Sequence, residues 1–123
     1  MTEVRDVMST ELVIVTPSTT VAEAATVMGT RKVGSALVME GTALLGIFTE
    51  RDVLRAVGSD FDAEHHAVSE FMTADPHTAR ATEDAHDALG SMLAFGFRHL
   101  PVVEGTAVVG IVSMRDLTRA ISG

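Results

Sequence analysis

Residues 38–52 read Val38-Met-Glu-Gly-Thr-Ala-Leu-Leu-Gly-Ile-Phe-Thr-Glu-Arg-Asp52, and the rest of the chain is arranged around this stretch because it occurs twice. Sixty-four residues later the chain reads Val102-Val-Glu-Gly-Thr-Ala-Val-Val-Gly-Ile-Val-Ser-Met-Arg-Asp116. Sliding residues 4–58 onto residues 68–122 needs no gap and gives 15 identities in 55 positions. A constant offset over half a chain indicates the tandem duplication of a unit of about 60 residues.

The repeated stretch predicts a β-hairpin that leads into a helix. Two apolar runs, Ser35–Met39 and Ala43–Phe48, flank a short Glu-Gly-Thr turn, which is typical of paired antiparallel strands. Thr49 then stands where an N-cap is expected, before a helix over residues 50–57. The second copy predicts the same elements at residues 99–103, 107–112 and 114–121, with Ser113 as the cap.

Each repeat also predicts a polar arm, a short strand and a helix before its hairpin. Val4, Val7 and Met8 have the spacing of one helical turn, and Leu12–Val15 is a brief β-branched run. Thr20 and Glu23 fit a capping box. The counterparts in the second repeat are a poorer strand at Pro76–Ala79 and a helix capped by Thr82 or Asp84. The two helices are expected to end in glycine-containing turns at Val33-Gly34 and Phe95-Gly96.

These elements predict an α+β fold made of two β-α-β-β-α repeats. We expect repeat 1 at residues 1–58, an acidic linker at 59–67 and repeat 2 at 68–123. A repeat of this length is marginal as an independent fold, so the two are expected to pack with pseudo-twofold symmetry around a shared core. The chain is 46% hydrophobic with five Phe and no Trp or Tyr, so the core is aliphatic. This apolar composition suggests that a partner copy covers part of the surface.

Charge and composition narrow the classes of function. The net charge of −8 argues against binding a nucleic-acid backbone. The absence of cysteine excludes disulfides and thiolate metal sites. No apolar run approaches the length of a membrane span, and the first residues are polar and acidic. We therefore expect a soluble, cytoplasmic protein.

The motifs resemble those of the cystathionine-β-synthase (CBS) domain family. Gly46-Ile-Phe-Thr-Glu-Arg-Asp52 and Gly110-Ile-Val-Ser-Met-Arg-Asp116 carry its glycine-hydrophobic-x-Thr/Ser-x-x-Asp pattern. Arg98-His-Leu-Pro-Val-Val103 is similar to the family's basic-Leu-Pro-Val-Val segment, and Val4-Arg-Asp-Val-Met8 to its opening segment. The whole chain thus resembles a tandem pair of CBS domains, the assembly called a Bateman module.

The resemblance implies a sensor for adenosine-containing ligands such as AMP, ADP, ATP or S-adenosylmethionine. It further implies two symmetry-related clefts between the repeats and a disc-like homodimer. In this family the adenine usually rests against the backbone of the short first strand. The residues that would serve are Val13, Val15 and Thr16 in one repeat, and His77, Ala79 and Arg80 in the other.

The hydroxyl-x-x-Asp pattern also has a physical logic for nucleotides. Free N–H groups at a helix start attract anions, and an Asp one turn later offers acceptors for the paired ribose hydroxyls. The same pattern is close to an ordinary capping box, so one copy alone would favour a structural role. Two copies inside a family pattern favour ligand contacts. The candidates are Thr49, Arg51 and Asp52, and Ser113, Arg115 and Asp116.

A basic segment distinguishes the two repeats. Arg98 and His99 precede Leu100-Pro101, where the family often places phosphate-contacting residues. The first repeat has Gly34 and Ser35 at the equivalent positions, although Arg31 and Lys32 lie close in the sequence. Gly34, Ser35 and Pro101 are retained as candidate ligand contacts. We expect the two clefts to differ, so that one is empty or prefers an uncharged ligand.

Other chemistry finds little support in the sequence. His65 and His66 lie near Asp62 and Glu64, but adjacent side chains in a linker seldom converge on one ion. No catalytic triad pattern or phosphate-binding glycine loop is present, so we expect neither a metal site, nor a required cofactor, nor an enzyme.

The sequence therefore predicts a regulatory module that binds an adenosyl nucleotide. Ligand occupancy would shift a conformational equilibrium and act on a partner. The chain ends at Gly123, directly after the last predicted helix, so the partner is expected to be a separate protein. The alternative is a structural dimerisation module with vestigial, non-binding clefts. In either case the expected interface consists of two helix faces, Val53/Leu54/Val57 and Leu117/Ala120/Ile121.

Overall fold

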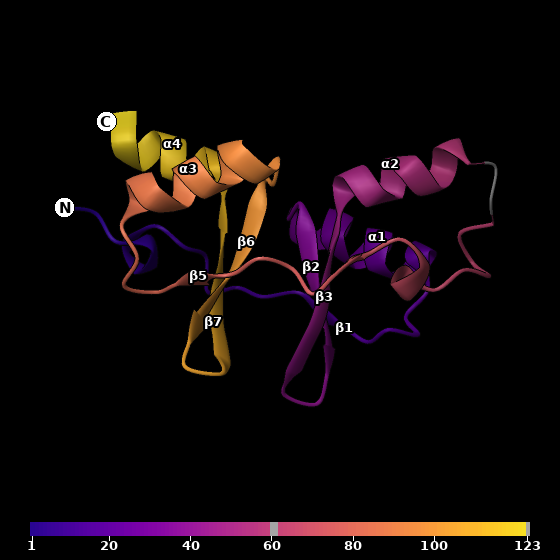
Figure 1. Cartoon of the computed structure of the whole chain (residues 1–123). Coiled ribbons are helices and arrows are strands. Elements are labelled where there is room, and N and C mark those ends of the chain that lie inside the picture. Colours follow the sequence, from indigo (N-terminus) through magenta and orange to yellow (C-terminus); the bar gives the residue numbers. More distant parts are fainter. Residues whose placement is uncertain (60–61, 123) are drawn as a thin grey trace. The chain divides into compact units, whose positions relative to one another are not determined.

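The fold is mixed α+β, as the sequence predicts. The computed structural model describes residues 1–59 and 62–122, and these residues form four α-helices and seven short strands in two sheets (Figure 1). None of the helices in these two ranges has the length and apolar character needed to cross a membrane. The chain divides into two compact units, which are described separately below.

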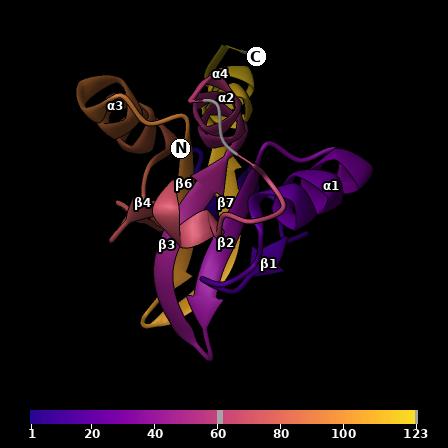
Figure 2. The same ribbon diagram turned by 90° about the vertical axis from the view of Figure 1, so that its right-hand side faces the viewer.

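The first-repeat unit comprises Val13–Pro76. It contains a sheet of four strands in the order β1-β2-β3-β4, in which β1 runs parallel to β2 and the other pairs are antiparallel. Figures 1 and 2 both show β2 and β3 side by side as one hairpin. The elements are β1 (Ile14–Val15), α1 (Val21–Arg31), β2 (Ser35–Glu40), β3 (Ala43–Thr49), α2 (Glu50–Gly58), a 3₁₀ turn (Val68–Glu70) and β4 (Thr73–Ala74).

The second-repeat unit comprises Met1–Leu12 and the chain from His77 onward. Its sheet has the order β5-β6-β7, with β5 parallel to β6 and β6 antiparallel to β7. The elements are a 3₁₀ turn (Val4–Asp6), β5 (Ala79–Arg80), α3 (Ala85–Phe95), β6 (His99–Glu104), β7 (Ala107–Ser113) and α4 (Met114–Ser122).

The predicted hairpins and helix caps are confirmed. Gly41 and Gly105 adopt φ values of +62° and +61° in the two hairpin turns, a conformation that side chains disfavour. The Thr20 hydroxyl accepts from the Glu23 N–H at 3.0 Å, completing the capping box of α1. Of the two caps considered for α3, the structure has Asp84, whose Oδ1 accepts from the His86 N–H at 2.7 Å.

The ends of α1 and α3 differ from one another. Gly96 takes the left-handed conformation at the end of α3, with φ +78°, as expected of a glycine. In the first repeat the same position is Lys32, with φ +54°, and Gly34 lies beyond the cap. α1 therefore runs into the glycine-containing segment Val33-Gly34 as predicted, but the left-handed residue that ends the helix is Lys32 rather than a glycine.

The segments that precede the two first strands are exchanged between the repeats. We call residues 4–12 the first arm and residues 68–76 the second arm, because they correspond at the 64-residue offset. Val4 is fully buried in the core of the second-repeat unit, and Val68 is fully buried in the core of the first-repeat unit. In Figure 1 the indigo N-terminal segment accordingly lies beside the orange and yellow elements. Each core is thus completed by a residue from the other repeat.

Backbone hydrogen bonds pair the first arm with β7 and the second arm with β3. The Ser9 N–H donates to the Ile111 carbonyl at 2.8 Å, and the Ile111 N–H donates back at 2.9 Å. The second arm forms the equivalent pairing as β4, in which Thr73 and Ala74 lie opposite Ile47 and Gly46. The sequence analysis did not predict β4.

The arms explain why glycine recurs at positions 46 and 110. A Cβ on Gly46 would lie 2.6 Å from the Met72 sulfur and 2.8 Å from the Thr73 carbonyl oxygen. A Cβ on Gly110 would lie 2.5 Å from the Met8 sulfur and 2.9 Å from the Ser9 carbonyl oxygen. Each arm therefore passes so close to its strand that a side chain has no room.

The two predicted interface faces differ in exposure. On α2, Leu54 is 72% exposed and Val57 is 64% exposed. On α4, Leu117 is fully buried in the core of its own unit, and Ile121 packs against that core. Leu117 is therefore not available to an interface, whereas Ala120 and Ile121 are partly exposed.

Candidate nucleotide site

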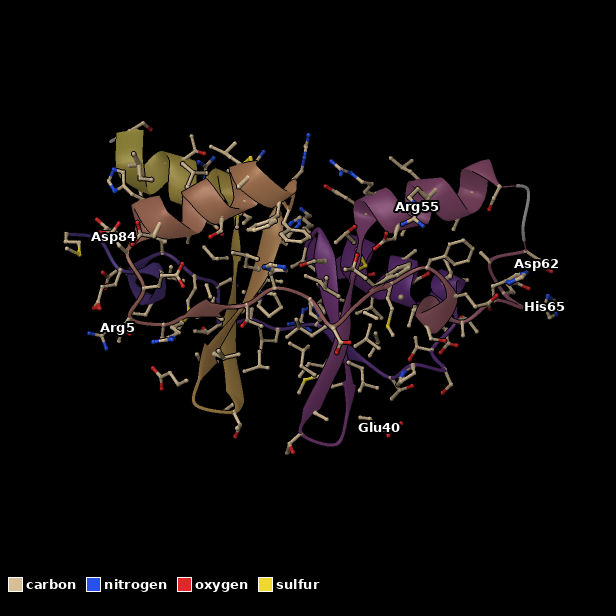
Figure 3. The ribbon with its side chains drawn as sticks, in the orientation of Figure 1. Arg5, Glu40, Arg55, Asp62, His65 and Asp84 are labelled. Carbon is tan, nitrogen blue, oxygen red and sulfur yellow. The ribbon has the colours of Figure 1, made fainter. Side chains whose placement is uncertain are left out.

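In the Thr49–Asp52 turn at the start of α2, hydrogen bonds from neighbouring residues occupy both carboxylate oxygens of Asp52. The Thr49 N–H donates to Oδ2 of Asp52 at 2.8 Å, and the Asp52 N–H donates to the Thr49 hydroxyl oxygen at 3.4 Å. Oδ1 of Asp52 accepts from the Arg55 guanidinium at 2.8 Å, and Figure 3 labels Arg55 on α2. Asp52 is only 4% exposed. Both of its oxygens are thus engaged.

The Ser113–Asp116 turn at the start of α4 has the same cap but is more open. The Ser113 N–H donates to Oδ2 of Asp116 at 3.0 Å, and the Asp116 N–H donates to the Ser113 hydroxyl oxygen at 3.1 Å. Asp116 is only partly buried. Within the described ranges Oδ1 of Asp116 accepts no hydrogen bond, and Arg119, the counterpart of Arg55, makes no ion pair with it.

The basic segment lies beside the second turn. His99 is paired with Ser113 across β6 and β7, and the Arg98 carbonyl accepts from the Met114 N–H at 2.8 Å. Arg98 is exposed and His99 partly buried, whereas Pro101 is buried in the sheet. The second-repeat unit therefore brings Arg98 and His99 to the N-terminus of α4, together with Ser113 and Asp116.

The first-repeat unit has the same geometry without the basic side chains. Ser35 pairs with Thr49, and the Gly34 carbonyl accepts from the Glu50 N–H at 3.0 Å. Ser35 is 7% exposed, so its hydroxyl offers little surface to a ligand. Arg51 and Arg115, the arginines inside the two turns, are both exposed.

Most of the candidate contact side chains in and beside the two first strands, β1 and β5, are buried. Val13 and Val15 are 5% and 7% exposed and belong to the core of the first-repeat unit, and Ala79 is buried in the other core. These residues can offer a ligand only backbone groups. Thr16 and Arg80 are exposed.

The sequence analysis missed an aromatic cluster in the second-repeat unit. The His77 ring centroid lies 4.8 Å from that of Phe95 and 4.9 Å from that of Phe97. A comparison of the two repeats at the 64-residue offset indicates it, because the second repeat has His77, Phe95 and Phe97 where the first has Val13, Arg31 and Val33. We refer to these three rings as the aromatic cluster.

The linker histidines pair with carboxylates. His65 Nδ1 hydrogen-bonds to Asp62 (Figure 3), and His66 Nδ1 lies 2.9 Å from Oε1 of Glu70. These hydrogen bonds, helped by backbone N–H donors, hold the carboxyl pKa of Asp62 and of Glu70 below their ordinary values. Over residues 1–59 and 62–122, no three acidic or histidine side chains gather in a way that could hold a metal ion.

Comparison with known proteins gives the same two repeats. A family model described as the CBS domain matches residues 4–59 and 68–123. The CBS domain-containing protein YhcV of Bacillus subtilis is 35% identical over 118 residues, which cover 95% of this chain and 84% of that protein.

Solved structures share the whole fold. The CBS domain pair of protein MJ0100 in complex with 5-methylthioadenosine and S-adenosyl-L-methionine superposes with a TM-score of 0.90 at 25% identity, covering 100% of this chain and 98% of that one. The structure of CBSX2 in complex with AMP gives a TM-score of 0.82 at 26% identity, covering 99% and 97%.

Proposed function

Because the chain belongs to the CBS-domain family as a tandem pair of repeats, we propose that it is a regulatory module that binds an adenosyl ligand. The candidate ligands are AMP, ADP, ATP and S-adenosylmethionine or a related thioadenosine. Two of the similar structures hold ligands of this class, AMP in one and methylthioadenosine with S-adenosylmethionine in the other.

The observation that carries this proposal is the open turn at the start of α4. Oδ1 of Asp116 is available as an acceptor next to the Ser113 hydroxyl. The Arg98 carbonyl accepts a hydrogen bond from the Met114 N–H, which places Arg98 at the same end of α4. An ionised carboxylate accepts hydrogen bonds from two vicinal hydroxyls, and a guanidinium donates in a fork to phosphate. Vicinal ribose hydroxyls and a phosphate are the polar groups of a nucleoside phosphate.

Regulation would follow from differential affinity. A ligand shifts a conformational equilibrium only if it binds one state more tightly than the other. We propose that the bound state presents a different surface to a separate protein, in the context of a homodimer. The exposed Leu54 and Val57 on α2 provide an apolar face for association of two copies.

The test is a thermal-shift titration of ligand-stripped protein with AMP, ADP, ATP, S-adenosylmethionine and methylthioadenosine. A ligand at one hundred times its Kd stabilises a fold by about 2.7 kcal/mol, which produces a readily measured shift in Tm. A saturable shift with one of these ligands supports the proposal and ranks the importance of phosphate. If none of the five shifts the Tm, the chain is not an adenosyl sensor.

A second candidate function is dimerisation without ligand binding, which the exposed apolar face of α2 favours. Replacing Leu54 by Lys should convert a dimer to a monomer with little loss of stability, because the side chain is 72% exposed. Replacing Asp116 by Ala should remove ligand binding and leave the dimer intact. Sedimentation velocity on both variants, with the titration above, separates the two functions.

A further inference from the structure

In each arm a methionine sulfur packs against the glycine of the neighbouring strand. Met8 of the first arm and Met72 of the second arm correspond at the 64-residue offset, and we call them the arm methionines. The Met8 sulfur lies 2.5 Å from the place where a Cβ on Gly110 would stand. The Met72 sulfur lies 2.6 Å from the same place on Gly46. Each sulfur thus fills the space that a side chain on the strand would need.

The arm methionines lie at the edge of the two cores. Met8 packs against the core of the second-repeat unit and Met72 against the core of the first-repeat unit, and both residues are partly exposed. By contrast, Met28 on α1 is 4% exposed and Met92 on α3 is fully buried. A small oxidant in solution therefore reaches the arm methionines in the folded protein, whereas it reaches the two helix methionines only when a unit opens.

Oxidation changes the properties on which this contact depends. The chain has no cysteine, so its sulfur chemistry is that of methionine. A methionine sulfur attacks hydrogen peroxide with a lone pair, so that an S–O bond forms, the O–O bond breaks and the second oxygen leaves as water. The thioether is thereby oxidised and the peroxide is reduced. The sulfoxide is larger and polar, and it has to fit between an apolar core and a strand backbone that the sulfur already touches.

The backbone pairing of each arm includes the residue that directly follows its methionine. Ser9 exchanges hydrogen bonds with Ile111 at 2.8 and 2.9 Å. Thr73 lies opposite Ile47 in the equivalent pairing. Ile111 and Ile47 in turn directly follow the two strand glycines. A methionine side chain that moves away from its glycine therefore disturbs the pairing that holds the arm.

We propose that the arm methionines are a peroxide-sensitive modification site, and that their oxidation releases the arms from their strands. Loss of the apolar contact and desolvation of the sulfoxide shift the equilibrium towards the released arm by about 5- to 30-fold. Release takes Val4 out of the second-repeat core or Val68 out of the first-repeat core. Peroxide therefore loosens the unit to which the oxidised arm belongs.

Hydrogen exchange followed by mass spectrometry tests the proposal without any nucleotide. After mild treatment with hydrogen peroxide, peptides from residues 4–12 and 68–76 should each gain the mass of one oxygen. Their backbone amides should then exchange about 5- to 30-fold faster than in untreated protein. Methionine sulfoxide reductases, with a dithiol that becomes a disulfide, remove the oxygen as water and should restore the slow exchange.

Single leucine variants give matched controls, because leucine replaces methionine with little change in volume. Met8→Leu should abolish the response of the first arm and leave that of the second arm intact, and Met72→Leu should do the reverse. Met39→Leu, at a partly exposed methionine of β2, should leave both responses intact. Circular dichroism should show that all three variants are folded.

The proposal is overturned if both arm sulfurs are oxidised and the arms still exchange at the untreated rate. It is also overturned if peroxide speeds the exchange of the first arm in Met8→Leu as much as in wild type, or if Met28 and Met92 are oxidised before the arm methionines. If a leucine variant does not fold, reversal by the reductases decides, and exchange that stays fast after reduction overturns the proposal. None of these outcomes depends on ligand binding, so the adenosyl-sensor function is tested separately.

Discussion

Two aspartates at equivalent positions have unequal surroundings, and only the first is bound by the arginine three residues later. Asp52 is buried, and it binds both the Thr49 backbone and Arg55. Asp116 is partly exposed and serves mainly as a cap for α4. The same motif is therefore mostly structural in the first repeat and more available in the second.

This difference predicts unequal losses of stability. Asp52→Ala leaves a buried N–H and an arginine without their partner, so it should lower the free energy of unfolding by about 2 kcal/mol. Asp116→Ala removes a cap and should cost about 1 kcal/mol. Urea unfolding at neutral pH measures both. Equal losses would mean that the Arg55 contact contributes nothing.

A second prediction at this scale concerns Lys32, which ends α1 with φ +54°. A left-handed backbone conformation costs a residue with a side chain about 1–2 kcal/mol, and glycine avoids this cost. Part of the gain is lost because glycine has more conformational entropy in the unfolded chain. Lys32→Gly should therefore stabilise the protein by about 0.5–1 kcal/mol. The matched control is Gly96→Ala, at φ +78°, which should destabilise it by a similar amount. Thermal unfolding of the two variants should move in opposite directions.

At the scale of elements, the two arms are held against strands that have glycine at the contact. Gly46→Ala and Gly110→Ala should each cost about 1–3 kcal/mol, because the new methyl meets a methionine sulfur and a backbone carbonyl. Gly90→Ala, on α3 with open space around it, should instead stabilise by about 1 kcal/mol.

A double variant refines this prediction. Adding Met8→Ala to Gly110→Ala removes the sulfur but not the Ser9 carbonyl, so it should fail to restore wild-type stability in urea unfolding. Full recovery would mean that the arm backbone moves away at no cost.

The carboxyl–histidine pairs around the linker predict how the stability of the fold depends on pH. The carboxyl pKa values of Asp62 and Glu70 lie below their ordinary values of 3.8 and 4.5 because histidine and backbone donors bind the ionised forms. Below about pH 4.5 the unfolded chain therefore binds protons that the folded chain does not, and stability falls as the pH falls. Glu70→Gln should show a flatter loss of stability between pH 5 and 3 than wild type in urea unfolding. Salt should reduce the difference, since these groups are exposed.

The elements that were predictable from the sequence are those with local signals. The glycine of each hairpin turn and the Thr20–Glu23 capping box act within four residues, so the pattern alone indicates them. The burial of Val68 in the first-repeat core depends on where a distant segment lies, and no local pattern reveals it. The aromatic cluster was missed for the same reason, because His77 lies 18 positions before Phe95 in the sequence.

The candidate site was predictable only in part. The hydroxyl and carboxylate of each turn follow from the repeated motif, and both form caps as expected. The engagement of Asp52 by Arg55 was not predictable, since an arginine at the same position of the second repeat makes no such contact. Side-chain rotamers at a helix surface depend on packing that the motif does not encode.

At the scale of the whole molecule, the compact units are not the sequence repeats. A fragment of residues 13–76 contains the whole core of the first-repeat unit, including Val68. A fragment of residues 1–59 contains the complete first repeat but lacks Val68 and Met72, which pack in that core. We expect the first fragment to show helical circular dichroism and a cooperative urea transition, although about 60 residues is marginal for a fold. The second fragment should show neither, and cooperative unfolding of residues 1–59 would contradict the exchange of arms.

The exchanged arms also set an order on folding during synthesis. As the chain leaves the ribosome, the first repeat emerges complete, yet its core waits for Val68 and the strand at Thr73–Ala74. The first arm, although made first, has no strand to join until Ile111 has been translated. Nascent chains are made at about 5–20 residues per second, so this arm stays unpaired for several seconds after the first core has closed. Residues 4–12 are thus among the last parts of the two units to fold, and they are the segment that a chaperone or a protease would meet.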